Sequence, residues 1–514
     1  MQDPTRGSNI LDQILTNMSS LYYKAQHVPP LGRSDHQCLL FVPLIQQQHI
    51  QPTTRTIRLL KPDNLRVLGL EVNMENWEAV SNAIEVDDKV EAFNLIVRGL
   101  LDTCIPERAV RMHPSDKEWI TPYIKNQIKA RQLAFTRGDE TNYRLLCCKV
   151  SRLISDAKGK FYEAKACDLR RSNPYKWFKY IHALSGVDQL ELRGLADKLH
   201  EVFTAPWQNR VPNALDVSDL IEELEDRTPI IPSVGEVKSI LKHLNPRKAT
   251  GVDGVPAWFR KRYHEELALV VHDIIKASIE QCKYPTDYKY AFISPVPKVS
   301  PPSDINNDFS QISVLPQLAK VLEKVQLKLN KHDLKINSTQ HAFLERRSTV
   351  SALASTTQDW YDSTDNCRDG GKGVHVVFVD FRKAFDLVDH GTLLTKLANM
   401  KVSKSFWLWI QSFLADRTQQ VKLLGALSAS RTVVAGVHQG EVISPMLFNV
   451  HMNDIEDTVP GVFQPSTCKY ADDCTQYEII SNGTGSHMEE VMNNLVVWAD
   501  KNMMELNVKI RWTN

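Results

Sequence analysis

Apolar residues recur at a helical spacing from about residue 62 to residue 184. The pattern is clearest in residues 83–104, where the apolar positions fall near a 3.6-residue repeat: Ile84, Val90, Phe93, Ile96, Val97 and Leu100. Residues 119–135, 142–170 and 173–186 have the same texture, and the last segment starts with Asn-Pro and ends at a glycine. This part of the chain is therefore predicted to be mainly helical.

From about residue 233 onward, helical segments alternate with short runs rich in β-branched and aromatic residues. Helices are predicted at 234–244 and 257–281, with a turn-rich loop between them. Strands are predicted at 290–298, 374–380, 418–423, 432–437 and, as a hairpin, 468–479. Strands interleaved with long helices predict an α+β architecture.

The first part of the chain has a different texture. NILDQILTN (residues 9–17) is predicted to be a short strand, and residues 29–43 a loop leading into a second strand. A Gln-rich, Pro-containing bridge follows at 46–55. These changes divide the chain into three predicted regions, 1–46, 47–232 and 233–514.

The overall charge balance hides a local asymmetry. The net charge is only +1, yet residues 125–179 hold 14 Lys or Arg against 5 Asp or Glu, and residues 197–236 hold 3 against 9. The basic stretch is predicted to be a nucleic-acid-facing helix pair beside an acidic spacer. A helical segment with an ordinary charged outer face explains the same counts, so both interpretations stay open.

The cysteine pattern and the apolar runs indicate in which cellular compartment the protein is expected. Nine cysteines occur without a CxxC pair or a Cys/His ligand spacing, which favours reduced thiols inside the cell, in the nucleus or cytoplasm. The polar start, MQDPTRGSN, does not resemble a signal peptide, and no apolar run approaches the ~18 residues of a membrane span. We expect a protein that is neither secreted nor membrane-spanning.

Two acidic motifs suggest chemistry. Asp380 follows directly on the apolar run VHVVFV, and an unpaired carboxylate at the end of a core strand is costly unless it is neutralised or binds a metal. Alone, it could equally be a capping or turn aspartate. Asp472 and Asp473 lie at the tip of the predicted hairpin, where their mutual repulsion favours a divalent cation. Together the three carboxylates suit two Mg²⁺ ions about 4 Å apart.

Several motifs, in this order, resemble the blocks of reverse transcriptases of Jockey- and LINE-like non-LTR retrotransposons. They are NPRKATGVDGVPAWF, NDFSQISVLPQLAKVLEKVQLKL, FVDFRKAFDLVDH, GVHQGEVISPMLFNVHMNDI, KYADD and WADKNMMELN, between residues 233 and 507. The resemblance implies right-hand polymerase fingers and palm, preceded by the helical linker. It also implies synthesis of DNA from dNTPs on an RNA template and a DNA primer.

The resemblance further implies residue roles. Asp380, Asp472 and Asp473 would be catalytic and hold two Mg²⁺ ions, with Mn²⁺ able to substitute. Phe385 falls where the family has the bulky residue that excludes a 2′-hydroxyl, although a core aromatic is the alternative interpretation. Gln439 would lie near the incoming nucleotide and Lys298 would meet its triphosphate.

The chain also departs from the family pattern. Ser310 stands where the family has an arginine that grips the triphosphate, so we expect weaker nucleotide binding. His438 and Glu441 replace a proline and a small hydroxyl residue, and Glu441 is expected to add an unfavourable charge near the triphosphate.

The family's thumb is expected to be missing after residue 514. The alternative function is therefore a catalytically inactive, nucleic-acid-binding remnant. An RNA-dependent RNA polymerase is disfavoured by Phe385.

The amino-terminal motifs resemble a second enzyme. NILDQILTN and LGRSDH are similar to the last strands of an apurinic-type endonuclease, an α/β sandwich that precedes the polymerase in such retrotransposons. By this match Asp12, Asp35 and His36 would be its remnant residues, with a surface loop as the alternative. We expect no endonuclease activity, because the metal-binding glutamate of that fold would lie before Met1. The sequence does not indicate an oligomeric state.

Overall fold

The computed structural model describes residues 26–28, 38–40, 53–112, 119–169, 189–207, 218–299, 304–365, 373–423, 425–458, 466–480, 485–507 and 512–513. By contacts the chain divides into two units, one of residues 1–59 and 106–187, the other of residues 60–105 and 188–514. This grouping crosses the sequence-based boundaries near 46 and 232, and the three predicted regions stay predictions.

The first unit contains a helix pair and two small strand pairs. Helices α4 (Pro122–Thr136) and α5 (Glu140–Leu169) correspond to two of the predicted helices, and Phe135 contacts Tyr143 across their short connection. The strand pairs are β1 (Gln26–Val28) with β2 (Cys38–Leu40), and β3 (Thr53–Arg58) with β4 (Glu107–Met112). The predicted strand 9–17 and helix 173–186 lie outside the described residues.

Strands β3 and β4 differ from the prediction, which placed a bridge at 46–55 and only helices from 62 to 184. Thr53, Thr54 and Thr56 suit an extended strand, but β3 pairs with a strand that follows the helices of residues 62–104. A pairing partner that distant leaves no local sequence signal.

The second unit begins with helices α1 (Pro62–Met74), α2 (Glu78–Ser81) and α3 (Val86–Cys104). Val90, Phe93 and Val97 are fully buried, as the 3.6-residue repeat predicts. Ile84 is 81% exposed, so its assignment to the apolar face was wrong. It lies before the helix starts, where the helical period does not apply.

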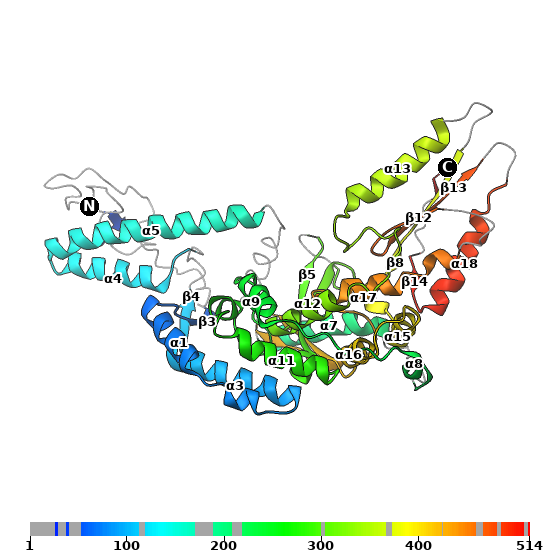
Figure 1. Cartoon of the computed structure of the whole chain (residues 1–514). Coiled ribbons are helices and arrows are strands. Elements are labelled where there is room, and N and C mark those ends of the chain that lie inside the picture. The colour runs from blue at the N-terminus through cyan, green and yellow to red at the C-terminus, as the bar shows by residue number, and fades with distance from the viewer. Residues whose placement is uncertain are drawn as a thin grey trace, which may run out of the picture. The chain divides into compact units, whose positions relative to one another are not determined.

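The second unit contains a five-stranded sheet, of which Figure 1 labels strand β5. Its order is β10-β9-β5-β6, with β11 also pairing with β9, and β5 and β9 run parallel. The strands are β5 (Tyr290–Pro297), β6 (Phe309–Val314), β9 (Thr418–Leu423), β10 (Ala426–Leu427) and β11 (Arg431–Thr432). Accompanying helices are α7 (Gln189–Thr204), α8 (Ser218–Glu223), α9 (Val234–Lys242), α12 (Gln317–Asn330), α15 (His390–Asn399) and α16 (Lys404–Leu414).

Two predicted elements need correction. Residues 257–281 form two helices, α10 (Ala257–Arg262) and α11 (Ala268–Glu280), although no glycine or proline interrupts them. The buried Arg260 pairs with Asp253, and the Tyr263 hydroxyl donates to the Leu65 carbonyl, so these contacts orient α10 separately from α11. Of the predicted strand at 432–437, only its first residue lies in a strand, β11.

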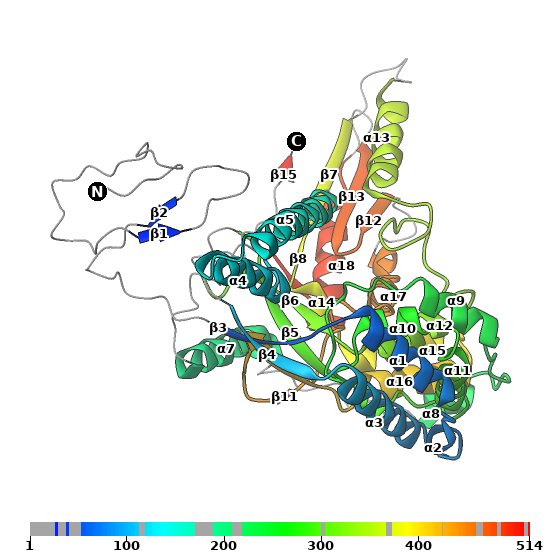
Figure 2. The ribbon, with the colours of Figure 1, turned by 90° about the vertical axis from the view of Figure 1, so that its left-hand side faces the viewer.

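A second sheet has the order β12-β13-β7-β15, and all its pairs are antiparallel. Its strands are β7 (Gly373–Val379), β12 (Ser466–Tyr470), β13 (Asp473–Ile480) and β15 (Trp512–Thr513). Figure 2 shows β7, β13 and β12 side by side, with α13 (Thr349–Asp365) along β12. Also near this sheet are α14 (Ala384–Leu387), α17 (Ser444–His451), η4 (Ile455–Thr458), α18 (Met488–Lys501), and the pair β8 (Phe381–Arg382) with β14 (Glu505–Leu506).

The predicted α+β class is confirmed in its coarse form, because sheets and many helices are both present. The endonuclease fragment and the missing thumb stay predictions. Among the described helices, none combines the length and apolarity needed to cross a bilayer.

Candidate active site

The ends of β7 and β13 bring two of the predicted carboxylates together. The last residue of β7, Val379, pairs with Cys474, and the antiparallel register places Asp380 opposite Asp473 one step further. Both aspartates are exposed, on the same face as the exposed Phe378, whereas Val379 and Cys474 face the buried side. A strand that is apolar on its buried face thus ends by presenting a carboxylate to solvent.

A two-residue turn supplies the third carboxylate. Tyr470 pairs with Asp473, so Ala471 and Asp472 form the loop of the predicted hairpin, and Asp473, predicted at the tip, is the first residue of β13. Ala471 has φ +59, the left-handed value that the first position of a type II′ turn requires. A non-glycine residue there is strained by roughly 1 kcal/mol. Asp472 is half-buried beside its two acidic neighbours.

The three carboxylates influence one another. Burial raises the pKa of Asp472, and the charges of Asp473 and Asp380 raise it further. Burial and the charge of Asp380 likewise raise the pKa of Asp473. This mutual repulsion is the condition that a bound divalent cation relieves, and carboxylate oxygens are the ligands that Mg²⁺ prefers.

The site is not closed around a cation in this conformation. Within the described ranges, no three acidic, His or Cys side chains already converge closely enough to hold a metal ion. Asp380 Oδ2 accepts a hydrogen bond from Asn507 Nδ2 at 2.8 Å, which orients this carboxylate. The donor set fits Mg²⁺ chemically, and the metal assignment stays a prediction.

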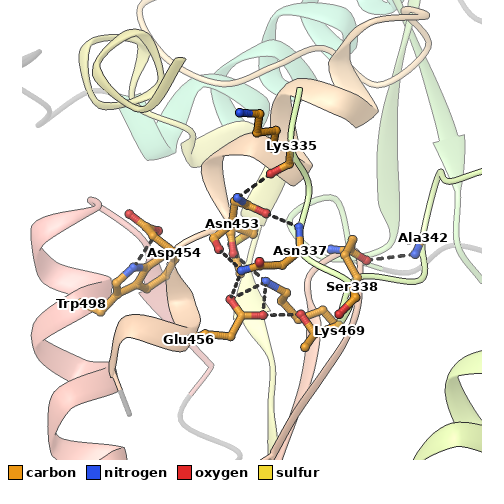
Figure 3. Close-up of polar contacts among 12 residues, drawn as sticks. Lys335, Asn337, Ser338, Ala342, Asn453, Asp454, Glu456, Lys469 and Trp498 are labelled. Carbon is orange, nitrogen blue, oxygen red and sulfur yellow. Dashed lines mark hydrogen bonds and ion pairs between the residues drawn. The ribbon is translucent and has the colours of Figure 1, made fainter. Parts of the chain in front are cut away.

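The end of β12 next to the hairpin turn is held on one side by residues 337–342 (Figure 3). Lys469 in β12 is fully buried, and its ammonium pairs with Glu456 at 2.7 Å and donates to the Met452 carbonyl. The backbone of Lys469 also exchanges hydrogen bonds with Thr339 and His341, both 2.8 Å. These contacts extend β12 with a short parallel partner and hold the hairpin against η4.

Gln340 fixes the turn itself and was not identified from the sequence. Its side-chain oxygen accepts from the backbone N–H of Ala471 at 3.0 Å and from that of Ala342 at 2.9 Å, and the residue is 1% exposed. The hydrogen bond to Ala471 compensates part of the strain at its positive φ. A lone glutamine between polar neighbours gives no local signal of this role.

Phe385 lies in a cluster of aromatic rings with Phe343 and Phe448. Its ring stacks on Phe448 with centroids 4.2 Å apart and meets Phe343 edge-on at 6.1 Å. The side chain is only half-buried. The packing fixes the orientation of the ring while leaving part of its surface accessible, which suits both a steric gate and the alternative of a core aromatic.

Gln439 is an exposed residue in a loop beside β6. Its carbonyl accepts from the Ser313 backbone N–H at 2.8 Å, and Gly440 follows with φ +114. A Cβ on Gly440 would lie 2.7 Å from the Ser313 carbonyl oxygen, so glycine is needed for this close approach. Gly440 therefore lets the loop lie close against β6.

Lys298 and Ser310 share one face of the β5–β6 ribbon. Val296 pairs with Ser310, and side chains alternate along a strand, so Lys298 projects to the same side as Ser310. Both side chains are accessible, and Lys298 is exposed. An arginine at position 310 would therefore lie beside Lys298.

Glu441 is not exposed to a triphosphate, which corrects the expectation from the sequence. It is fully buried and forms an ion pair with the equally buried Arg417, while the Ser444 hydroxyl donates to it at 2.6 Å. Burial opposes its ionisation, but the Arg417 guanidinium and His438 hold the pKa of Glu441 well below its usual range. The charge of Glu441 lies in the interior because its partner is Arg417, which comes immediately before β9 and 24 residues before Glu441.

A second buried acid shares this network. Glu323 on α12 accepts from the backbone N–H groups of Val442 and Ile443 at 2.6 and 3.3 Å, and Tyr284 donates to it at 3.2 Å. Burial, and then the charge of Glu441, raise the pKa of Glu323 to about 7. The charge of Arg417 thus lowers the pKa of both Glu323 and Glu441, and Glu323 is the more readily protonated of the two.

This arrangement predicts a pH-dependent effect of Glu323→Gln. A carboxyl group whose pKa is higher in the folded state stabilises the fold below its unfolded pKa, near 4.5, and loses that contribution as the pH rises through about 7. Glutamine keeps the acceptor for Val442 and Ile443 but does not titrate. Relative to wild type, the unfolding free energy of the variant should rise from pH 5 to pH 8, on the order of 1 kcal/mol or more. Denaturant titrations at the two pH values measure it.

The matched control is Glu265→Gln. Glu265 is an exposed carboxylate whose pKa is lowered by Lys238, so it stays ionised throughout this range. Its stability difference from wild type should be the same at pH 5 and pH 8. An equally flat difference for Glu323→Gln would contradict the proposed protonation of Glu323.

These features define a class of protein. A carboxylate at the end of one strand, two more on the adjoining hairpin, and a neighbouring two-stranded ribbon bearing a lysine suit the two-metal chemistry of nucleotide polymerases.

Comparisons with known proteins narrow the class. Residues 296–510 match the family described as "Reverse transcriptase (RNA-dependent DNA polymerase)". The chain is 25% identical over 300 residues to the probable RNA-directed DNA polymerase from transposon BS of Drosophila melanogaster, covering 55% of this chain and 32% of that protein. It is 26% identical over 286 residues to the RNA-directed DNA polymerase from mobile element jockey of the same species, covering 53% and 30%.

Residues 296–510 therefore match a reverse transcriptase domain, and these relatives are polymerases of mobile elements, which confirms the resemblance seen in the motifs. It spans about a third of the length of the curated relatives that it matches.

Proposed function

We propose that this chain is an RNA-directed DNA polymerase that transfers nucleotides from dNTPs to a primer 3′-hydroxyl on an RNA template. The observation that carries the proposal is the register of β7 and β13, which sets Asp380 opposite Asp473 and beside the turn of Asp472. Primer extension by the purified chain, with an RNA template, a DNA primer, dNTPs and Mg²⁺, tests it.

The residues of this chain would divide the work as follows. Asp380, Asp472 and Asp473 would hold the divalent cations that the reverse transcriptase family uses, two Mg²⁺ or in their place Mn²⁺. Such cations supply activation of the 3′-hydroxyl and stabilisation of the departing pyrophosphate. Gln340 and Lys469 would keep the hairpin fixed so that the carboxylates need not reorganise during the reaction.

Nucleotide selection is assigned to the surrounding residues. Phe385, fixed by Phe448, would exclude a 2′-hydroxyl. Gln439 would contact the incoming nucleotide from the loop beside β6, and Lys298 would meet the triphosphate from the exposed face of β5. These roles follow the family pattern and the exposure of each side chain.

The helix pair α4–α5 is proposed as a further contact to nucleic acid. Lys129, Arg137, Lys149 and Arg152 are exposed on these helices, and Lys158 lies 5.0 Å from the ring centroid of Trp119. Exposed basic residues combined with aromatic rings suit a polyanionic, base-bearing partner. An ordinary solvated helix face stays the alternative.

Ser310→Arg should improve nucleotide use. It would add a guanidinium beside Lys298, able to bind a triphosphate in a bidentate manner. We expect kcat/KM for dNTPs to rise by ~10- to 100-fold, mainly through KM, because such a charge-assisted contact is worth about 1.5–3 kcal/mol. Steady-state primer extension at varied dNTP concentration measures the change.

The control for this variant is Asn306→Arg, which adds the same charge in the exposed turn between β5 and β6. If both variants changed kcat/KM equally, position 310 would not be a triphosphate contact. If wild type and Ser310→Arg both failed to extend a primer at high dNTP concentration while still binding RNA in a filter assay, the alternative of a catalytically inactive, nucleic-acid-binding remnant would be favoured.

The resemblance of the amino-terminal motifs to an endonuclease remnant stays a separate proposal. Asp12, Asp35 and His36 lie outside the described residues, and no role in polymerisation is proposed for them.

A further inference from the structure

Helix α7 and the short helix η2 (Ala205–Trp207) lie well before the matched residues 296–510, in the segment that the sequence assigned to a linker. They are nevertheless part of the core of the second unit. His200 is fully buried, Phe203 is 5% exposed and Trp207 is 7% exposed. Helix α7 packs on β9 and β10, and η2 contacts α14, which carries Phe385.

Two hydrogen bonds connect this segment to the turn that carries Phe385. The Trp207 indole Nε1 donates to the Asp386 carbonyl at 2.8 Å, immediately after Phe385. Before Phe385, the Lys383 ammonium donates to the Val202 carbonyl of α7 at 3.2 Å. Lys383 has φ +47, so the chain turns sharply here and depends on outside contacts to hold its conformation.

Residues 433–437 hold the same turn. Val437 N–H donates to the Phe385 carbonyl at 2.9 Å, and a Cβ on Gly436 would lie 2.7 Å from the Asp386 carbonyl oxygen. Trp207 packs against Val433 and Ala435 in one buried cluster. The cavity left between Trp207, Asp386 and the 435–439 loop is about 10 Å³, roughly one water.

A chain of buried polar contacts extends from α7 to the same loop. His200 Nδ1 lies 2.9 Å from the Ser428 hydroxyl, and its Nε2 lies 3.4 Å from Gln419 Nε2. Gln419 Oε1 in turn lies 3.2 Å from His438 Nε2, next to Gln439. Burial, and then the charge of Arg431, lower the pKa of His200 to about 4, so this imidazole is neutral at physiological pH.

We propose that α7–η2 is a structural part of the nucleotide site, and that Trp207 is a positioning residue that holds the Phe385 ring against the sugar of the incoming nucleotide. The proposal rests on the proposed polymerase function. Because the Trp207 indole bonds the main chain next to Phe385, its effect is on discrimination between dNTPs and rNTPs rather than on the chemical step. A turn released on this side lets the ring retreat and admit a 2′-hydroxyl.

Trp207→Phe removes the N–H donor while keeping an aromatic ring in the cluster. We expect the ratio of kcat/KM for dTTP to that for UTP to fall by about fivefold, through a lower KM for UTP, with kcat for dTTP within about twofold of wild type. We also expect hydrogen exchange of the amides of Asp386 and Val437 to accelerate by about fivefold, because the turn opens more often.

Asp197→Ala is the matched control. It removes another hydrogen bond of α7, from the Ala429 N–H at 2.8 Å, but none to the Phe385 turn, so both measurements should match wild type. Unchanged discrimination in an active Trp207→Phe enzyme would overturn the proposal. If wild type extends no primer, the proposed function fails instead. Hydrogen exchange of the Asp386 and Val437 amides in Trp207→Phe then tests the structural claim. Faster exchange supports the role of Trp207 in holding the turn, and unchanged exchange overturns it.

Discussion

Asp472→Asn should abolish primer extension, reducing its rate by about 10³-fold or more. The amide keeps the shape of the side chain but removes a charge from the turn where Asp472, Asp473 and Asp380 repel one another. Without that charge the site loses affinity for divalent cations. Extension of a DNA primer on an RNA template, in Mg²⁺ and separately in Mn²⁺, measures the loss, and chelation of the metal with EDTA should have the same effect on wild type.

The matched control is Glu490→Gln, an exposed carboxylate in the first turn of α18. It should keep wild-type extension, because it removes the same charge from an exposed position that is not a proposed metal ligand. Extension that survived Asp472→Asn, or that continued in EDTA, would sink the assignment of the three aspartates as the metal-binding residues.

Arg417→Met should destabilise the second unit by about 3–5 kcal/mol. Arg417 is 1% exposed, pairs with the buried Glu441, donates to the Phe413 carbonyl at 3.0 Å, and lies 4.6 Å from the Phe413 ring centroid. Methionine fills much of the volume but leaves Glu441 and Glu323 in the interior without a cation. Denaturant unfolding followed by tryptophan fluorescence reports the change, since Trp407 and Trp409 are buried in this unit.

Two further variants separate the buried charge from packing. Arg144→Met makes the same substitution in an exposed pair with Glu140 and should cost no more than about 0.5 kcal/mol. The double variant Arg417→Met, Glu441→Gln should recover part of the lost stability, because it removes the carboxylate that was left unpaired. A double variant no more stable than Arg417→Met would show that packing of the guanidinium, and not its charge, is what matters.

The local elements could be predicted because their signals lie within short windows. The repeat of Val90, Phe93 and Val97 identifies the buried face of α3, and the apolar run before Asp380 identifies β7. The prediction failed where one short stretch of sequence contained two elements. It also failed where a contact with a distant residue ended a helix. The break near Tyr263 between α10 and α11 is of the second kind, because it accompanies contacts with Asp253 and Leu65.

The candidate site shows the same division. Motif order identified the three aspartates, but no pattern indicated that Gln340 accepts from the backbone of the hairpin turn, since a single amide side chain has no spacing to recognise. The charge of Glu441 was noticed but interpreted as facing substrate. Its location in the interior depends on Arg417, which only the folded chain brings to it.

By itself the sequence determined the helices with a 3.6-residue repeat, the strand that ends in Asp380, the hairpin of Asp472 and Asp473, and the order of motifs that marks a reverse transcriptase. The tertiary structure decided which distant segments meet: β7 with β13, β5 parallel to β9, and Trp207 behind Phe385. The reason is physical. Periodicity and turn chemistry act between neighbours along the chain, whereas strand register and the burial of charged or polar groups depend on partners that only folding brings within reach.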